Sequence, residues 1–149
     1  RTSIEAISSG EILSILLNVV DYGTGGRVRR APYNITAQMG GKTGTTNFNA
    51  DGWFMGFTPQ LVTGVWVGGD ERYIHFNSMA EGQGASMALP IFGKYMKSVF
   101  GDKDLPYDQE ITFAFPAGFD PCRRVGIDAL PEDTEETVVE EEVIEGMFD

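Results

Sequence analysis

The stretch from residue 36 to residue 68 limits the possible folds most, because it predicts three short strands joined by tight turns. We expect the strands at residues 36–46, 53–58 and 61–68. Apolar side chains alternate along the second and third segments, which is the period of a strand with two different faces. The links between the segments are rich in Asn, Asp, Pro and Gly, which are typical of turns. Links this short favour an antiparallel meander.

A nearly continuous apolar segment precedes these strands. Residues 12–20 are apolar almost all round, which is typical of a helix that is buried on most sides. Ser8 and Glu11 have the spacing of a capping box, which predicts the start of the helix. Gly23 is placed to end it in the left-handed conformation.

A second helix is expected after the strands. Residues 86–100 predict an amphipathic helix with Ser86 as its N-cap. Its predicted buried stripe contains Ala88, Ile91, Phe92, Tyr95, Met96 and Val99. One further strand is expected at residues 110–115. The predicted fold class is therefore α+β, with an antiparallel sheet flanked by helices.

Charge is distributed unevenly over the 149 residues. The formal net charge is −11, but residues 128–149 hold ten of the 22 acidic residues and none of the 11 basic ones. We expect this acidic tail to be disordered and residues 102–127 to form an extension beyond a domain at residues 1–101. The remaining body has a net charge of −1, which argues against nucleic-acid binding. No apolar run reaches the ~18 residues of a membrane-spanning helix.

Few side chains suggest a metal, disulfide or triad site. Cys122 is the single cysteine, so an internal disulfide is excluded, and an exposed free thiol is expected. His75 is the single histidine and lies in a polar loop, so we interpret it as a surface residue. Three arginines, Arg27, Arg29 and Arg30, could meet a phosphate or carboxylate, although a solvated edge is favoured. We expect no metal ion and no cofactor.

The most informative motif is Gly41-Lys42-Thr43-Gly44-Thr45-Thr46. A phosphate-binding P-loop would need a glycine at position 36, where Thr36 stands, and a helix after the motif, where turn residues follow. A second interpretation is a Lys-Thr-Gly sequence on an exposed strand. Alternation would put Thr43 and Thr45 on one side and Lys42 on the other. Hydroxyls, an ammonium and free backbone groups could then hold a peptide carboxylate. A glycine-rich strand with an unrelated lysine remains the alternative.

Four segments together carry a family resemblance. They read VVDYGTG, GKTGTT, DGWFMGFTP and GVWVG, at residues 19–25, 41–46, 51–59 and 64–68. In this order they resemble the C-terminal half of the transpeptidase domain of class A, bifunctional penicillin-binding proteins, over about residues 4–100. The resemblance implies part of a penicillin-binding-protein or β-lactamase-like fold. It also implies a parent protein that is a peptidoglycan glycosyltransferase, anchored in the cytoplasmic membrane with this domain periplasmic.

The resemblance also implies a chemistry. A serine would attack the D-Ala-D-Ala end of a peptidoglycan stem peptide, as a transpeptidase or carboxypeptidase, and β-lactams would acylate the same serine. Lys42 would supply positive charge to the proton-transfer network. Thr43 and Thr45 would bind the substrate carboxylate, beside Gly44 and Thr46, and the Thr45 N–H would be an oxyanion-hole donor.

The sequence also departs from the family pattern. It contains neither a Ser-x-x-Lys nor a Ser-x-Asn motif. Ser86 follows Gly84 as in a nucleophile elbow, but Ala88 stands where the second glycine of that motif would be. We therefore expect an inactive half of a catalytic domain, whose partner is the missing N-terminal half. That half would cover the helix at residues 12–20. Two alternatives stay open, a non-catalytic periplasmic peptide-binding module and a structural domain without a ligand.

Overall fold

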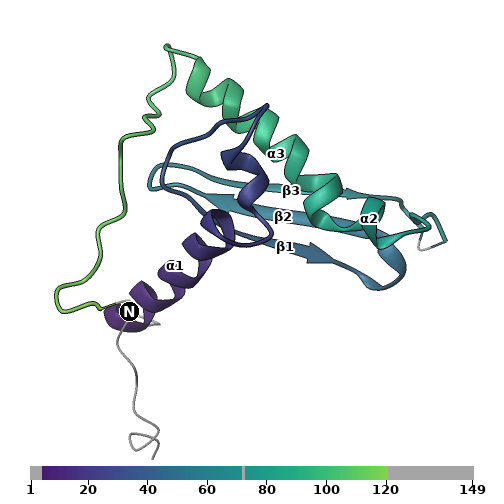
Figure 1. The fold of residues 1–149 in the computed structure, drawn as a ribbon, viewed down its shortest axis with the longest axis horizontal. Helices are drawn as coiled ribbons and strands as arrows, with labels where there is room; N and C mark the ends of the chain where they lie inside the picture. Colours follow the sequence, from purple (N-terminus) through teal and green to yellow (C-terminus); the bar gives the residue numbers. More distant parts are fainter. Residues whose placement is uncertain (1–4, 72, 121–149) are drawn as a thin grey trace, which may run out of the picture.

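The computed structural model describes residues 5–71 and 73–120. Along the chain its elements are α1 (Ala6–Asp21), the 3₁₀ helix η1 (Gly26–Arg29), β1 (Gly40–Thr45), the 3₁₀ helix η2 (Asn47–Asn49), β2 (Asp51–Phe57), β3 (Val62–Gly68), α2 (Met79–Gly82) and α3 (Gly84–Gly101). After α3 the chain runs back towards α1 without a helix or strand (Figure 1). The acidic tail and Cys122 lie outside the described residues.

The three strands form an antiparallel meander in the order β1-β2-β3, which confirms the predicted α+β class. Trp53 in the middle strand faces Gly44 on one side and Trp66 on the other. The first strand is shorter than predicted, because residues 36–39 do not pair with β2. Instead the backbone N–H groups of Thr36 and Ala37 donate to Oε1 of Gln109, at 3.0 and 3.3 Å.

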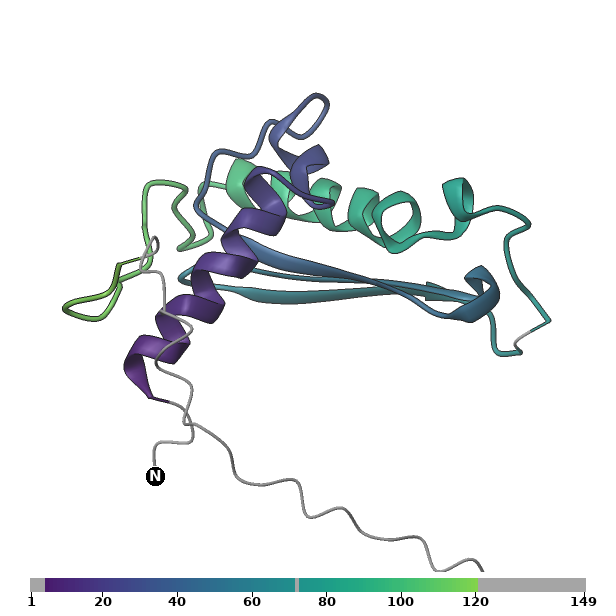
Figure 2. The same cartoon turned by 60° about the horizontal axis from the view of Figure 1, so that its bottom comes forward.

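Helix α3 covers one face of the sheet, and the hydrophobic core lies between them (Figure 2). The rings of Phe54 and Phe92 meet at the centre of this layer, with centroids 4.7 Å apart, and both are fully buried. Gly56 lets the Phe92 ring approach the backbone, since a Cβ at position 56 would lie 2.4 Å from its Cζ. Burying two aromatic rings makes this contact the main apolar link between helix and sheet.

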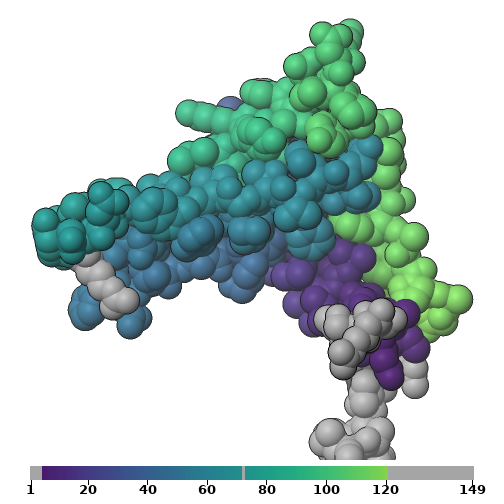
Figure 3. Space-filling model, turned by 180° about the vertical axis from the view of Figure 1, so that it is seen from behind, coloured from purple at the N-terminus to yellow at the C-terminus, as the bar shows by residue number. Residues whose placement is uncertain are grey.

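The opposite face of the sheet is not covered by any described element. Trp53, Met55, Val62 and Trp66 point to this side and are 44% to 70% exposed. Seen from behind, the strands form an open surface with α1 at one end (Figure 3). The register of Lys42 with Met55 puts the lysine on this same face.

Helix α1 lies against β1 at one end of the sheet (Figures 1 and 2). It begins at Ala6 with Glu5 as its N-cap, so the predicted capping box at Ser8 is wrong, because Ser8 lies inside the first turns. The left-handed ending at Gly23 is also wrong, since Gly118 is the one glycine with positive φ among the described residues. Few α1 side chains are buried, and Ile12 and Ile15 are exposed, because the main contacts of α1 with other described elements are those with β1 and η1.

Helix α3 begins two residues earlier than predicted. Its N-cap is Gln83, and Ser86 lies in the first turn with its N–H donating to the Gln83 carbonyl, so the predicted N-cap is wrong. Ile91 and Tyr95 of the predicted stripe are exposed, whereas Leu89 is buried. The buried face is rotated because η1 and the residues after it cover a second side of α3.

The segment after α3 is held by glutamine side chains. Gln60 accepts a hydrogen bond from the Asp108 N–H at 2.9 Å, and Gln38 accepts one from the Phe113 N–H at 2.6 Å. The strand predicted at residues 110–115 is therefore wrong, because side-chain amides rather than a neighbouring strand bind this backbone.

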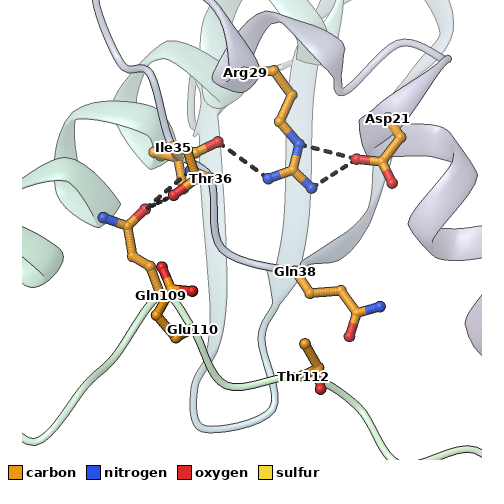
Figure 4. Close-up of a pocket in the computed structure, with 8 residues that line it drawn as sticks. All are labelled: Asp21, Arg29, Ile35, Thr36, Gln38, Gln109, Glu110 and Thr112. Atoms are coloured by element: carbon orange, nitrogen blue, oxygen red, sulfur yellow. Dashed lines mark hydrogen bonds and ion pairs between the residues drawn. The ribbon is translucent and has the colours of Figure 1, made fainter.

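Arg29 joins the end of α1 to the segment that leads into β1 (Figure 4). Its Nε and Nη2 donate to the same Asp21 oxygen at 3.0 and 2.7 Å, and Nη1 donates to the carbonyls of Ile35 and Ala37 at 3.1 and 2.6 Å. Arg27 and Arg30 are exposed, as expected of a solvated edge. Arg29 is instead a structural cation that fixes where β1 begins.

Replacing Phe92 by alanine tests the helix–sheet contact. We expect the free energy of unfolding to fall by about 3–5 kcal/mol, because the change leaves a cavity beside Phe54. Denaturant unfolding measures it. The control Tyr95→Ala, on the exposed side of the same helix, should change stability by no more than about 0.5 kcal/mol. Equal losses in the two variants would contradict this packing.

Replacing Arg29 by alanine tests the arginine bridge. We expect a loss of about 1.5–3 kcal/mol in unfolding free energy, since charged hydrogen bonds to two buried carbonyls disappear. Arg30→Ala is the matched control and should be nearly neutral. The same thermal and denaturant melts report both variants, and a neutral Arg29→Ala would show that the bridge does not hold the segment.

Candidate functional site

The Lys-Thr-Gly sequence lies on β1, which is an edge strand of the described sheet. Gly40 and Gly41 are buried where α1 packs on the strand, but the end towards Thr45 is half-exposed or exposed. The structure therefore brings Lys42, Thr43, Gly44 and Thr45 to an accessible sheet edge. An edge strand with exposed backbone can accept an extended peptide.

Lys42 is solvent-exposed, and its ammonium donates to the Thr43 carbonyl at 2.7 Å. The pairing of Lys42 with Met55 and of Thr43 with Phe54 confirms the prediction that the lysine and the threonines lie on opposite faces. No acidic partner of Lys42 occurs among the ion pairs of residues 5–71 and 73–120.

Thr43 is positioned by the loop after α1. Its hydroxyl lies 3.2 Å from the hydroxyl of Thr24, and either oxygen can donate. Sequence reasoning did not identify Thr24 as part of the site, although it lies in one of the segments that carry the resemblance. The loop after α1 therefore reaches the Lys-Thr-Gly strand directly.

Thr45 offers two polar groups in different directions. Its hydroxyl oxygen accepts a hydrogen bond from the Gly84 N–H at 3.1 Å, although the residue itself is exposed. The next residue, Thr46, donates its N–H to the Asp51 carbonyl in β2 at 3.0 Å. Because backbone groups alternate in direction along an antiparallel strand, the N–H of Thr45 points away from β2 towards the open edge.

Thr46 closes the turn between β1 and β2. Its hydroxyl donates to Asp51 Oδ2 at 3.2 Å and accepts the Asp51 N–H at 2.9 Å. Asp51 Oδ1 in turn accepts the indole N–H of Trp66 at 3.1 Å. The Thr46 side chain is therefore engaged within the fold, and its part in substrate binding stays a prediction.

A separate polar pocket of about 570 Å³ lies between the end of α1 and the segment after α3 (Figure 4). Its walls include Asp21, Arg29, Gln38 and Gln109 but none of the Lys-Thr-Gly residues. The Arg29 guanidinium has its donors directed at Asp21 and two carbonyls, so it is not a free anion site.

Other candidate chemistry finds little support in the part of the chain that the structure describes. His75 is exposed, with Nδ1 3.1 Å from the Phe76 carbonyl, and Ser86 lies in the first turn of α3. No group of three or more His, Cys, Asp and Glu within the described ranges could hold a metal ion. Among these same residues, no helix combines the length and hydropathy needed to cross a membrane.

Known proteins resemble this chain in sequence and fold, although no family model matches it. Penicillin-binding protein 1A of Rickettsia bellii is 38% identical over 104 residues, covering 69% of the chain and 12% of that protein. Penicillin-binding protein 1A of Pseudomonas aeruginosa is 38% identical over 116 residues, or 77% of the chain and 13% of that protein. The crystal structure of penicillin-binding protein 1A from Haemophilus influenzae superimposes with a TM-score of 0.52 and 30% identity, covering 65% of the chain and 15% of that structure.

The chain thus spans about an eighth of the length of these relatives. In this chain a helix packs on a three-stranded antiparallel sheet, and the edge strand of that sheet carries Lys-Thr-Gly. Sequence similarity and fold therefore agree with the four segments that carry the resemblance. The chain belongs to the class A penicillin-binding proteins, as a part of their transpeptidase domain.

Proposed function

We propose that this chain supplies the Lys-Thr-Gly strand of a serine-type peptidoglycan D,D-transpeptidase. The observation that carries the proposal is the accessible edge strand itself. It offers the Lys42 ammonium on one face and the hydroxyls of Thr43 and Thr45 on the other. The direction of the Thr45 N–H, towards the open edge, supports the same assignment. A nucleophilic serine is not part of the proposal for this chain, because the sequence holds no Ser-x-x-Lys motif.

The proposed reaction has two steps. A serine oxygen supplied by the upstream half of the domain attacks the carbonyl carbon of the penultimate D-Ala, and the terminal D-Ala leaves with a proton on its nitrogen. An amine of a neighbouring stem peptide then attacks the ester carbonyl and releases the serine. A water molecule in place of the amine gives carboxypeptidase activity.

Each strand residue has a proposed role in these steps. The Thr45 N–H donates to the oxyanion of the tetrahedral intermediate, a contact whose loss typically costs roughly 10²–10³ in rate. Thr43 and Thr45 hydroxyls bind the carboxylate of the terminal D-Ala. Lys42 adds positive charge where protons move between the serine and the leaving amine. Gly44 leaves room for the extended peptide to approach the backbone.

The partners and the location follow from the same proposal. The ligands are stem peptides ending in D-Ala-D-Ala and β-lactam antibiotics that mimic them. The parent protein would be anchored in the cytoplasmic membrane, with this domain in the periplasm. A glycosyltransferase domain would lie elsewhere in the parent protein. The upstream half of the domain would cover the exposed Ile12 and Ile15 of α1.

Replacing Lys42 by alanine in the product of the complete reading frame tests its role. We expect the rate of acylation by benzylpenicillin to fall about 10²–10⁴-fold, because a charge beside the proton-transfer network is lost. The melting temperature should stay unchanged, since the lysine is exposed. Lys94→Ala, an exposed lysine on α3, is the control. Acylation of Lys42→Ala at the unaltered rate would remove Lys42 from the mechanism.

Intact mass after penicillin treatment tests the assignment as a whole. The product of the complete reading frame should gain one penicilloyl group, whereas the 149-residue chain should gain none, because it lacks the motif of the nucleophile. An adduct on the 149-residue chain would place the nucleophile within it. No adduct on either protein would favour a peptide-binding module at the β1 edge.

A further inference from the structure

The first turn of α3 meets the Lys-Thr-Gly strand at Thr45. The Gly84 N–H, at the first position of this 18-residue helix, donates to the Thr45 hydroxyl oxygen at 3.1 Å. The first N–H groups of a helix have no partner within it and carry the positive end of the helix dipole. One of these donors therefore forms a hydrogen bond with Thr45, a side chain of the proposed carboxylate site that lies 39 residues away in the sequence.

This contact requires glycine at position 84. A Cβ on Gly84 would lie 2.4 Å from the Trp53 carbonyl oxygen and 2.5 Å from the Gly44 carbonyl oxygen. Both neighbours are backbone atoms of the sheet, so they cannot move aside as a flexible side chain would. Gly52 faces the same junction, where an added Cβ would lie 3.2 Å from the Gly84 Cα. The two buried glycines let the helix end touch the backbone of β1 and β2.

The hydrogen bond also fixes what the Thr45 hydroxyl can do. A hydroxyl has one proton and two lone pairs, and here the Gly84 N–H occupies one lone pair. The hydroxyl proton must therefore point elsewhere, and Thr45 is a solvent-exposed residue. A donor whose oxygen accepts a hydrogen bond from the positive end of a helix is polarised, which strengthens its own hydrogen bond to an anion.

Resting on the function proposed above, we infer that Gly84 is a positioning residue that orients the Thr45 hydroxyl as a donor to the ligand carboxylate. Gly84 itself touches no ligand. It acts by bringing the N-terminus of α3 within hydrogen-bond distance of Thr45. The inferred specificity is for ligands with a negative charge at this point.

The test compares benzylpenicillin with its methyl ester, which keeps the β-lactam ring but has no carboxylate. We use the product of the complete reading frame and measure the acylation rate by mass. Gly84→Ala should slow acylation by benzylpenicillin about 10- to 100-fold and acylation by the ester much less, because a hydrogen bond to a charged group is lost. Gly101→Ala, at the far end of α3 with nothing within 4 Å of the added Cβ, is the control.

Thr45 variants keep the inference testable if Gly84→Ala does not fold. Thr45→Val should lose the preference for benzylpenicillin over the ester, and Thr45→Ser should retain it. In the double variant Gly84→Ala with Thr45→Val, the two losses should not add, since both remove one interaction. Equal slowing of both ligands by Gly84→Ala, or an unaltered preference in Thr45→Val, would overturn the inference.

The same experiment separates this inference from the proposed function. If the unaltered protein reacts with neither ligand, the transpeptidase proposal itself fails. If the unaltered protein reacts with both ligands and the variants keep its carboxylate preference, the transpeptidase proposal stands and only the role of Gly84 is lost.

Discussion

Close packing of α3 on the sheet is the contact on which the rest of the structure depends. The Phe54 and Phe92 rings meet in this layer, and the core around them also contains Val20 of α1 and Val28 of η1. The same contact fixes the distance between the N-terminal end of α3 and β1, so that the Gly84 N–H reaches the Thr45 hydroxyl. Stability and the geometry of the candidate site therefore arise from one helix–sheet layer, because a helix is rigid along its length.

A second set of contacts, made by Arg29 and by the loop after α1, positions the part of the site around Thr43. Arg29 ties the end of α1 to the segment before β1, and the loop between α1 and Arg29 brings Thr24 to Thr43. In contrast, the sheet face with Trp53 and Trp66 and the α1 side chain Ile15 are exposed. Exposed apolar surface of this kind marks an interaction site in a folded protein. It is consistent with the proposal that an upstream half of the domain packs there.

Much of the fold could be predicted from local patterns. Alternation predicted the strands and separated Lys42 from Thr43, because side-chain direction in a strand follows sequence position alone. The predictions that failed depend on neighbours. Ser86 is an inner residue of its helix because Gln83 precedes it as the cap, and Ile91 is exposed because a second element rotates the buried face. Residues 110–115 looked like a strand, but this segment pairs with no strand, and the Gln38 side chain accepts its Phe113 N–H.

The sequence by itself determined the order of the motifs, the antiparallel meander and the identity of the polar groups on β1. Those features follow from the two-residue side-chain period of a strand and from the short links between the strands. Only the tertiary structure decided which groups those residues meet. The partners of Thr43 and Thr45 are Thr24 and Gly84, which lie 19 and 39 residues away in the chain. Such contacts depend on where two helices pack on the sheet, and no local pattern encodes that distance.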